Sequence, residues 1–125
     1  MESRTYSVDE VIAERRQLHR QQVRVRGILS LAFEDCSLRP PGMRKRSREC
    51  ERKLWVQVPQ MKRAKYEEFK RDFEDRLVEI LGMLDVDDHG HMSVHPATLK
   101  GIVAIKMVTE DSKAPEQPGL GGQKD

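Results

Sequence analysis

Two nine-residue stretches of this chain, residues 23–31 and 78–86, follow one pattern, V-x-[VI]-x-G-[IM]-L-x-[LV]. In both stretches the apolar residues fall on alternate positions, as in a β-strand that buries one face. Gly27 and Gly82 interrupt the two stretches at the same place. A glycine inside a strand typically marks a bulge or a sharp bend. The repeat therefore predicts two long, bent strands, which favour a small curled sheet or barrel.

Local patterns predict four further elements: a helix over 7–19, a strand over 54–58, a helix over 61–74 and a strand over 102–108. The first helix opens with a capping box, in which the side chains of Ser7 and Glu10 each accept from the other's backbone amide. The second carries Tyr66, Phe69 and Phe73 on one side, so we expect these rings to face the core. The last stretch is almost wholly apolar, which is typical of a strand that is buried on both sides or closes a barrel.

The chain has 125 residues, which is enough for one self-sufficient core and too few for a second domain. We place this domain in residues 1–109. Residues 110–125 are rich in proline, glycine and charged residues. Such a composition cannot bury enough apolar surface to order the backbone, so we predict a disordered C-terminal tail.

The sequence shows neither of two common targeting signals. The N-terminus lacks the apolar stretch of a signal peptide, and no run reaches the roughly 18 apolar residues of a membrane span. Cys36 and Cys50 lack C-x-x-C spacing, so we expect two free thiols. We therefore predict a cytoplasmic protein without membrane contact. Its net charge of +2 is too small to favour nucleic acid over other partners.

The order of elements, with a helix before the second bent strand, resembles the oligonucleotide/oligosaccharide-binding (OB) fold. The resemblance rests on the two V-x-[VI]-x-G strands and their spacing, and covers roughly residues 7–109. It implies an α+β protein with a Greek-key β-barrel of about five strands, an N-terminal helix and one inserted helix. Such barrels bind extended ligands on one face and its neighbouring loops. Because the patterns supply only four strands, the fifth is expected within 39–53 or 92–101.

A narrower resemblance comes from short segments of the chain. Val-Arg-Val-Arg-Gly at 23–27 is followed by Phe-Glu-Asp at 33–35, Leu-Trp-Val at 54–56, a turn containing Gly and His, and a closing strand rich in Ile. This combination resembles small bacterial OB-like proteins without assigned function. The resemblance implies a bacterial origin and leaves the ligand open, because one fold serves many functions.

Trp55 and the basic loop 39–53 form the first candidate surface. The loop contains seven Lys or Arg and two Glu. An outward-facing tryptophan can stack on a base of a single strand while cations bind the phosphates. The residues assigned to this hypothesis are Arg24, Arg26, Arg39, Arg44, Lys45, Arg46, Arg48 and Trp55. A structural alternative stays open, in which Trp55 packs under a helix and the cations keep the loop soluble.

Three histidines, His89, His91 and His95, form a weaker candidate for metal binding. Imidazole groups beside aspartates are familiar zinc ligands. However, Gly90 and Pro96 indicate a turn, in which the spacing of these histidines has no established helical register. We therefore expect no metal and no other cofactor.

Catalysis has little support in the sequence. Cys36 follows Glu34 and Asp35, whose charges disfavour a reactive thiolate. No glycine-rich phosphate loop is present. We therefore predict a non-catalytic binding module. A protein partner is the leading hypothesis, because such barrels expose strand edges and the charge is balanced; the alternative is single-stranded nucleic acid bound by Trp55 and the loop 39–53.

Overall fold

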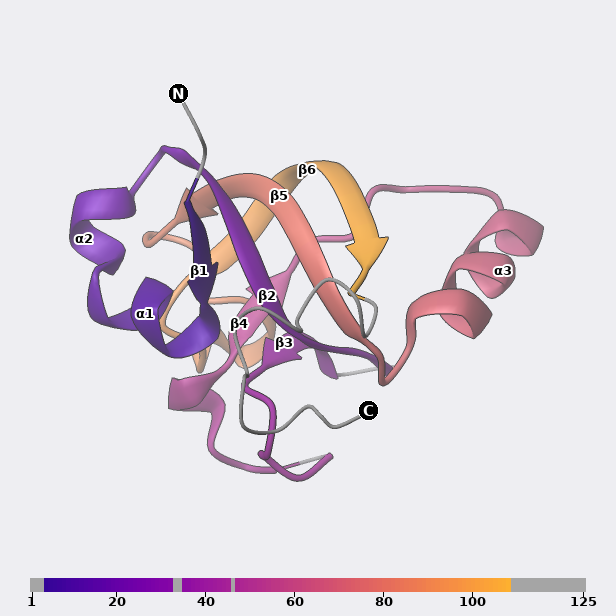
Figure 1. Ribbon diagram of the computed structural model, residues 1–125, viewed down its shortest axis with the longest axis horizontal. Helices are drawn as coiled ribbons and strands as arrows, with labels where there is room; N and C mark the ends of the chain where they lie inside the picture. Colours follow the sequence, from indigo (N-terminus) through magenta and orange to yellow (C-terminus); the bar gives the residue numbers. More distant parts are fainter. Residues whose placement is uncertain (1–3, 33–34, 46, 109–125) are drawn as a thin grey trace.

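Five strands close into a barrel in the structure, a computed structural model that describes residues 4–32, 35–45 and 47–108 (Figure 1). The neighbours follow the order β2-β3-β4-β6-β5, and β5 pairs again with β2. β4 and β6 are parallel, and the other barrel pairs are antiparallel. The predicted α+β barrel is confirmed, and its form is consistent with an OB-like fold. The strands are β2 (Gln22–Ala32), β3 (Asp35–Arg39), β4 (Leu54–Val56), β5 (Leu77–Asp85) and β6 (Thr98–Met107).

The two repeated stretches become β2 and β5, and they pair with each other in antiparallel orientation. Val23 lies opposite Gly82, and Gly27 lies opposite Val78. The alternate apolar side chains of both strands are buried, and they join those of β3, β4 and β6 in one core. The repeat in the sequence is therefore a pair of neighbouring strands in the fold.

Close packing requires both glycines. A Cβ atom at Gly27 would lie 2.8 Å from side-chain atoms of both Leu38 and Val8. A Cβ atom at Gly82 would lie 2.8 Å from the Cδ1 atom of Ile102. The register of β5 against β6 shifts around Gly82, which confirms the predicted bulge there. Just beyond Gly27, β2 exchanges β5 for β3 as its partner.

The N-terminal helix begins as predicted and breaks early. The amide of Glu10 donates to Ser7 Oγ at 3.1 Å, and the amide of Ser7 donates to Glu10 Oε1 at 2.8 Å, which confirms the capping box. The helix is interrupted at Glu14, so the expected single helix over 7–19 is in fact two short ones, α1 (Val8–Ala13) and α2 (Arg15–Leu18). An additional short strand, β1 (Thr5–Ser7), runs parallel to β2.

The inserted helix, α3 (Arg63–Phe73), lies on the opposite side of the barrel from α1 and α2 (Figure 1). Phe69 and Phe73 pack against the core, which confirms the predicted direction of these rings, and Tyr66 is half-buried. None of the residues of α3, all of which are described, is fully buried. The helix therefore contacts the barrel through one partly buried side, which its aromatic residues form.

The fifth strand is β3, which lies mostly before the region that the sequence indicates. The expectation of a strand within 39–53 or 92–101 is wrong for this element, because β3 is short and carries only two apolar residues, Cys36 and Leu38. The last strand, β6, begins at Thr98, earlier than the predicted 102. It closes the barrel as expected, but Val103 and Met107 are exposed.

Two predictions fall on parts of the chain that the structure does not describe. The tail 110–125 and Arg46 both lie outside the described residues. Within the described residues, none of the helices has the length and apolar character needed to cross a membrane.

Candidate functional site: a groove beside Trp55

A groove of about 970 Å³ opens between the loop 39–53 and the loop 86–97. In OB folds the second and third strands, with the loop between the fourth and fifth, bind ligands. β3, β4 and the loop 86–97 occupy these places here, so the groove lies on the face that this fold uses for ligands. Its lining consists of Ala32, Asp35, Ser47, Arg48, Cys50, Lys53, His91, Met92, Val94 and His95.

Trp55 points away from the core, as predicted, and lies beneath the loop 86–97. The backbone of Gly90 approaches so closely that a Cβ atom there would lie 2.6 Å from Trp55 Cγ. The ring of His91 stacks on the indole with centroids 6.0 Å apart, and the ring of His95 lies at 5.3 Å. The half-buried indole is therefore covered by a loop, an arrangement that differs from both a helix-covered ring and an open stacking platform.

The imidazole of His95 has an unusual environment. His95 is 5% exposed, and among the described residues neither of its ring nitrogens has a hydrogen-bond partner. Burial, together with the nearby ammonium group of Lys53, holds the pKa of His95 below its usual 6.5. The ring is therefore neutral at pH 7 and offers one donor and one acceptor. Both nitrogens are shielded from solvent, so a molecule that supplies their partners reaches them only if the loop 86–97 shifts.

Beside His95, the floor of the groove carries an ion pair. Lys53 is 4% exposed, and its Nζ donates to the carbonyl of Ser47 at 2.9 Å. The same Nζ lies 3.5 Å from Asp35 Oδ1, which also accepts from Ser37 Oγ at 2.6 Å. The two charges neutralise each other. At the rim, Arg48 is exposed and has no ion pair within the described part of the chain.

The tip of the loop 86–97 presents apolar side chains to solvent. Met92 is 75% exposed and Val94 is 49% exposed. Met92 and Ser93 both have left-handed backbones, with φ of 61° and 56°. Each non-glycine residue in this region costs about 1–2 kcal/mol. Strained backbone that holds apolar side chains outward is typical of a contact surface.

Arg39, which the sequence assigns to phosphate binding, is a structural residue. It is 7% exposed, its Nη1 donates to Ser30 Oγ at 2.6 Å, and its Nε donates to the carbonyl of Met43 at 3.1 Å. Lys45 is engaged as well, because its Nζ lies 2.7 Å from Asp75 Oδ2. These two cations hold the loop 39–53 to the segment that precedes β5.

Arg24 and Arg26 lie on a different part of the barrel from Trp55. In β2 the residue in line with Trp55 is Ser30, through Ser37 of β3. Arg24 and Arg26 are four to six residues earlier, which is about 13–20 Å along the strand. Arg26 forms an ion pair with Glu79. The structure therefore separates these two cations from the groove.

Only a small part of the assigned set comes together at the groove. Arg44 and Arg48 are both exposed on the loop 39–53, and Arg48 lines the groove. Trp55 contacts the groove through His91 and His95. Among the described residues of the assigned set, Arg48 and Trp55 therefore lie at the groove, and Arg44 does not line it.

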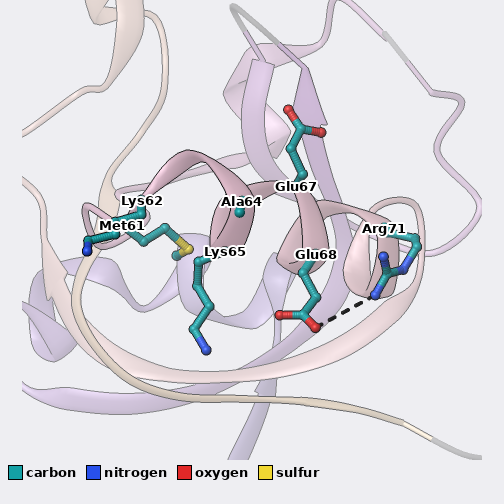
Figure 2. A pocket seen from close by; sticks show the side chains of 7 residues that line it. All are labelled: Met61, Lys62, Ala64, Lys65, Glu67, Glu68 and Arg71. Atoms are coloured by element: carbon teal, nitrogen blue, oxygen red, sulfur yellow. Dashed lines mark ion pairs between the residues drawn. The ribbon is translucent and has the colours of Figure 1, made fainter.

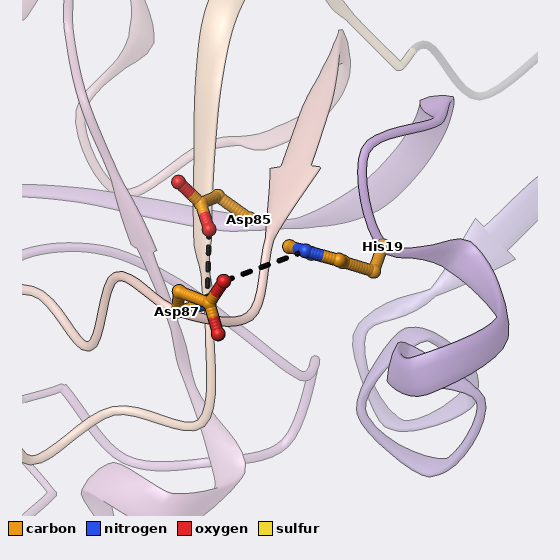
Figure 3. Close-up of side chains that lie close together, drawn as sticks. All are labelled: His19, Asp85 and Asp87. Atoms are coloured by element: carbon orange, nitrogen blue, oxygen red, sulfur yellow. Dashed lines mark hydrogen bonds and ion pairs between the residues drawn. The ribbon is translucent and has the colours of Figure 1, made fainter.

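The three histidines do not gather as metal ligands. His89 Nδ1 lies 2.8 Å from the carbonyl oxygen of His95, and His91 is stacked on Trp55. Within the described ranges a different set comes together, His19, Asp85 and Asp87, whose ligand-type atoms lie within 4.8 Å of one another (Figure 3).

The bonds within this second set explain it without a metal ion. His19 Nδ1 accepts from the amide of Val86 at 3.1 Å, so the proton of the neutral ring is on Nε2, which lies 3.6 Å from Asp87 Oδ2. Coordination of a metal at Nε2 would move this proton to Nδ1 and remove the bond from the Val86 amide. Asp85 is bound by Lys100 Nζ at 3.0 Å. The cluster therefore joins the segment after α2 to the end of β5.

A second hollow, of about 680 Å³, follows the exposed side of α3 (Figure 2). Its walls come from this helix and the two residues before it. Glu68 and Arg71 pair at 3.9 Å along the helix. All its polar side chains are exposed to solvent, as expected of the side of the helix that faces away from the aromatic residues. The lining residues are Met61, Lys62, Ala64, Lys65, Glu67, Glu68 and Arg71.

Comparisons with protein-family models, with curated proteins and with solved structures find no match for this chain. Evidence on function therefore comes from the groove itself. The sequence singles out His95 only as a weak metal ligand, and it gives no periodic signal for Lys53, Met92 or Val94. The structure brings all four to one groove.

Proposed function

We propose that this protein is a non-catalytic binding module that holds a short extended segment of a partner protein in the groove. The observation that carries the proposal is the buried imidazole of His95, which lacks hydrogen-bond partners among the described residues. Once a shift of the loop 86–97 exposes the imidazole, a peptide backbone supplies both a carbonyl acceptor and an amide donor, which match its two nitrogens. Met92 and Val94 would contact apolar side chains of the same segment.

The surroundings of the groove favour a protein over nucleic acid. Binding of single strands relies on open aromatic rings and on several free cations. Trp55 is covered by Gly90 and His91, while Arg39 and Lys45 are engaged by neighbouring residues. The mixed polar and apolar lining of the groove is better suited to a polypeptide.

Single-stranded nucleic acid is the second candidate. The exposed side chain of Arg48, which lines the groove, favours it, as does the position of the groove on the fold. The binding of a generic single-stranded oligonucleotide at increasing salt tests it. Affinity that falls steeply with salt and again in Trp55→Ala would support this candidate, whereas absence of binding at low salt would remove it.

The cellular setting is part of the same proposal. Cys36 and Cys50 are free thiols, as predicted, which fits a reducing compartment. We therefore propose the cytoplasm. A bacterial origin remains a prediction from the resemblance alone.

A displayed library of random twelve-residue peptides, selected on the full chain, provides the probe for the groove. His95→Leu keeps most of the side-chain volume and removes both nitrogens. We expect it to weaken the selected peptides about tenfold, because two hydrogen bonds are lost. Met92→Ala should weaken them less. Binding is measured by fluorescence anisotropy.

Met61→Ala is the matched control for Met92→Ala, because Met61 is a partly exposed methionine that lies outside the groove and outside β6. It should leave the affinity unchanged. Peptides that bind His95→Leu and wild type equally, or a library that yields no peptide dependent on the groove, would contradict the proposal. Unfolding curves of each variant separate lost binding from lost folding.

A further inference from the structure

In the part of the chain that the structure describes, the second half of β6 has one edge without a partner strand, which we call the open edge. β4 pairs with β6 only at Thr98 and Leu99, and the amide of Gln57 adds one bond to the carbonyl of Leu99 at 2.9 Å. Beyond Leu99, the only described strand beside β6 is β5. On this stretch Val103 is 62% exposed and Met107 is 42% exposed. Long apolar edges of this kind are usually paired, covered or charged.

The backbone groups on the open edge can be identified from the ladder with β5. The amide of Val108 donates to the carbonyl of Leu77 at 2.9 Å. In an antiparallel pair the bonding residues alternate, so Lys106 also bonds toward β5. The amides and carbonyls of Ile105 and Met107 therefore point to the open edge. An extended polypeptide is the ligand that complements such a row.

A row of charges crosses the sheet at the same level. Arg26 of β2 lies opposite Glu79 of β5, which lies opposite Lys106 of β6. Arg26 forms an ion pair with Glu79, and Lys106 Nζ lies 3.7 Å from Glu79 Oε1. Lys106 is the outermost member of this row, with 72% of its side chain exposed. The charges alternate in sign, so an acidic residue on an added strand would continue the pattern opposite Lys106.

We infer that the open edge of β6 binds an extended segment of a partner protein that carries an acidic residue opposite Lys106, with apolar residues on either side of it. The neighbours of that acidic residue fall on the face of Ile105 and Met107, which are apolar. A second copy of β6 is a poorer occupant, since the stretch from Thr98 to Met107 contains no Asp or Glu. This surface is distinct from the groove, which contains no residue of β6.

A capped peptide of alternating valine and glutamate is the probe, added to the isotope-labelled full chain. Amide hydrogen exchange measured by NMR should slow at Ile105 and Met107, while amides of the loop 86–97 keep their rates. A peptide with lysine in place of glutamate should bind about two- to fivefold more weakly. Lys106→Gln should abolish this preference, because it removes the charge that discriminates between the peptides.

Met107→Pro removes one outward-facing donor and leaves the ladder with β5 intact, because proline is tolerated where the amide faces away from the sheet. It should weaken the peptide about three- to tenfold. Met107→Ala, which keeps the amide, is the matched control and should have a smaller effect.

Three outcomes would overturn the inference: unchanged exchange at both amides, equal binding of the two peptides to wild type, or protection that grows with protein concentration without peptide. The last outcome would assign the edge to a second copy of the chain. None of these outcomes tests the groove, because binding at the edge is followed at the amides of Ile105 and Met107 and binding at the groove at those of the loop 86–97.

Discussion

Two walls of the barrel, one formed by β2 and β5 and the other by β3 and β4, differ in the polar side chains that they bury. The β2–β5 wall buries alternating apolar side chains, and its buried Glu79 is paired with Arg26 and Lys106. The β3–β4 wall and its neighbours bury a set of polar residues, namely Ser30, Ser37, Arg39, Lys53, His95 and Thr98. One of them, His95, lacks partners among the described residues. The first wall supplies packing, and the second buries polar groups that, apart from His95, are hydrogen-bonded within the described residues.

The largest expected effect tests the packing of the β2–β5 wall. Gly27→Val should destabilise the protein by about 3 kcal/mol, because the new side chain meets Leu38, Val8 and the carbonyl of Arg39. Urea unfolding measures the loss. Ala104→Val, at an exposed strand position, is the control and should change the free energy of unfolding by less than about 0.5 kcal/mol. Similar costs for the two variants would show that the wall is loosely packed.

The next effect concerns the polar wall. Arg39→Ala should cost about 2–3 kcal/mol, because it leaves the buried Ser30 hydroxyl and the carbonyl of Met43 without their donor. Arg44→Ala, which removes an exposed cation of the same loop, should cost less than about 0.5 kcal/mol. Equal free energies of unfolding for the two variants would show that Arg39 contributes no more to the fold than an exposed cation does.

A smaller effect should appear as a pH dependence of the polar wall. The pKa of His95 is lowered by burial and by Lys53, so the unfolded chain binds this proton more readily than the folded one. The stability linked to the neutral ring is present above about pH 6.5 and is lost as the pH falls through that value toward the folded-state pKa.

Thermal unfolding between pH 7.5 and 5.5 measures this dependence. The midpoint of wild type should fall more steeply than that of His95→Gln, which cannot titrate there. Arg44→Ala is the control, because Arg44 is an exposed cation that does not titrate in this range, and it should follow wild type. Parallel curves for wild type and His95→Gln would show that the buried imidazole has acquired a partner that stabilises its charged form.

The smallest effect should come from the outer face of the β2–β5 wall. Lys106→Gln should change the free energy of unfolding by less than about 1 kcal/mol, since the side chain is mostly exposed and Glu79 keeps Arg26. Denaturant unfolding at low and high salt provides the measurement. A larger loss would mean that Lys106 is needed for the fold itself, which would weaken its assignment to a partner.

The candidate site could be predicted only in part. The sequence places Trp55 on the outward side of its strand, and the alternation of Leu54 and Val56 is enough to show this. That Gly90 and His91 cover the indole does not follow from any local pattern, because they come from a loop more than thirty residues later. The hydrogen bonds of Arg39 to Ser30 and Met43 could not be predicted either, since a charged residue at the edge of a basic loop is expected to be exposed.

Local signals were enough to predict the two bent strands, their buried faces and the start of α1, because alternation, glycine placement and capping depend on residues within a few positions of each other. The three-dimensional fold was needed to show that the repeated strands pair together, that β3 completes the barrel and that His95 is buried beside Lys53. Those features depend on contacts between segments distant in the chain, where closure of the barrel sets which side chains meet. The groove and the open edge of β6 belong to this second class.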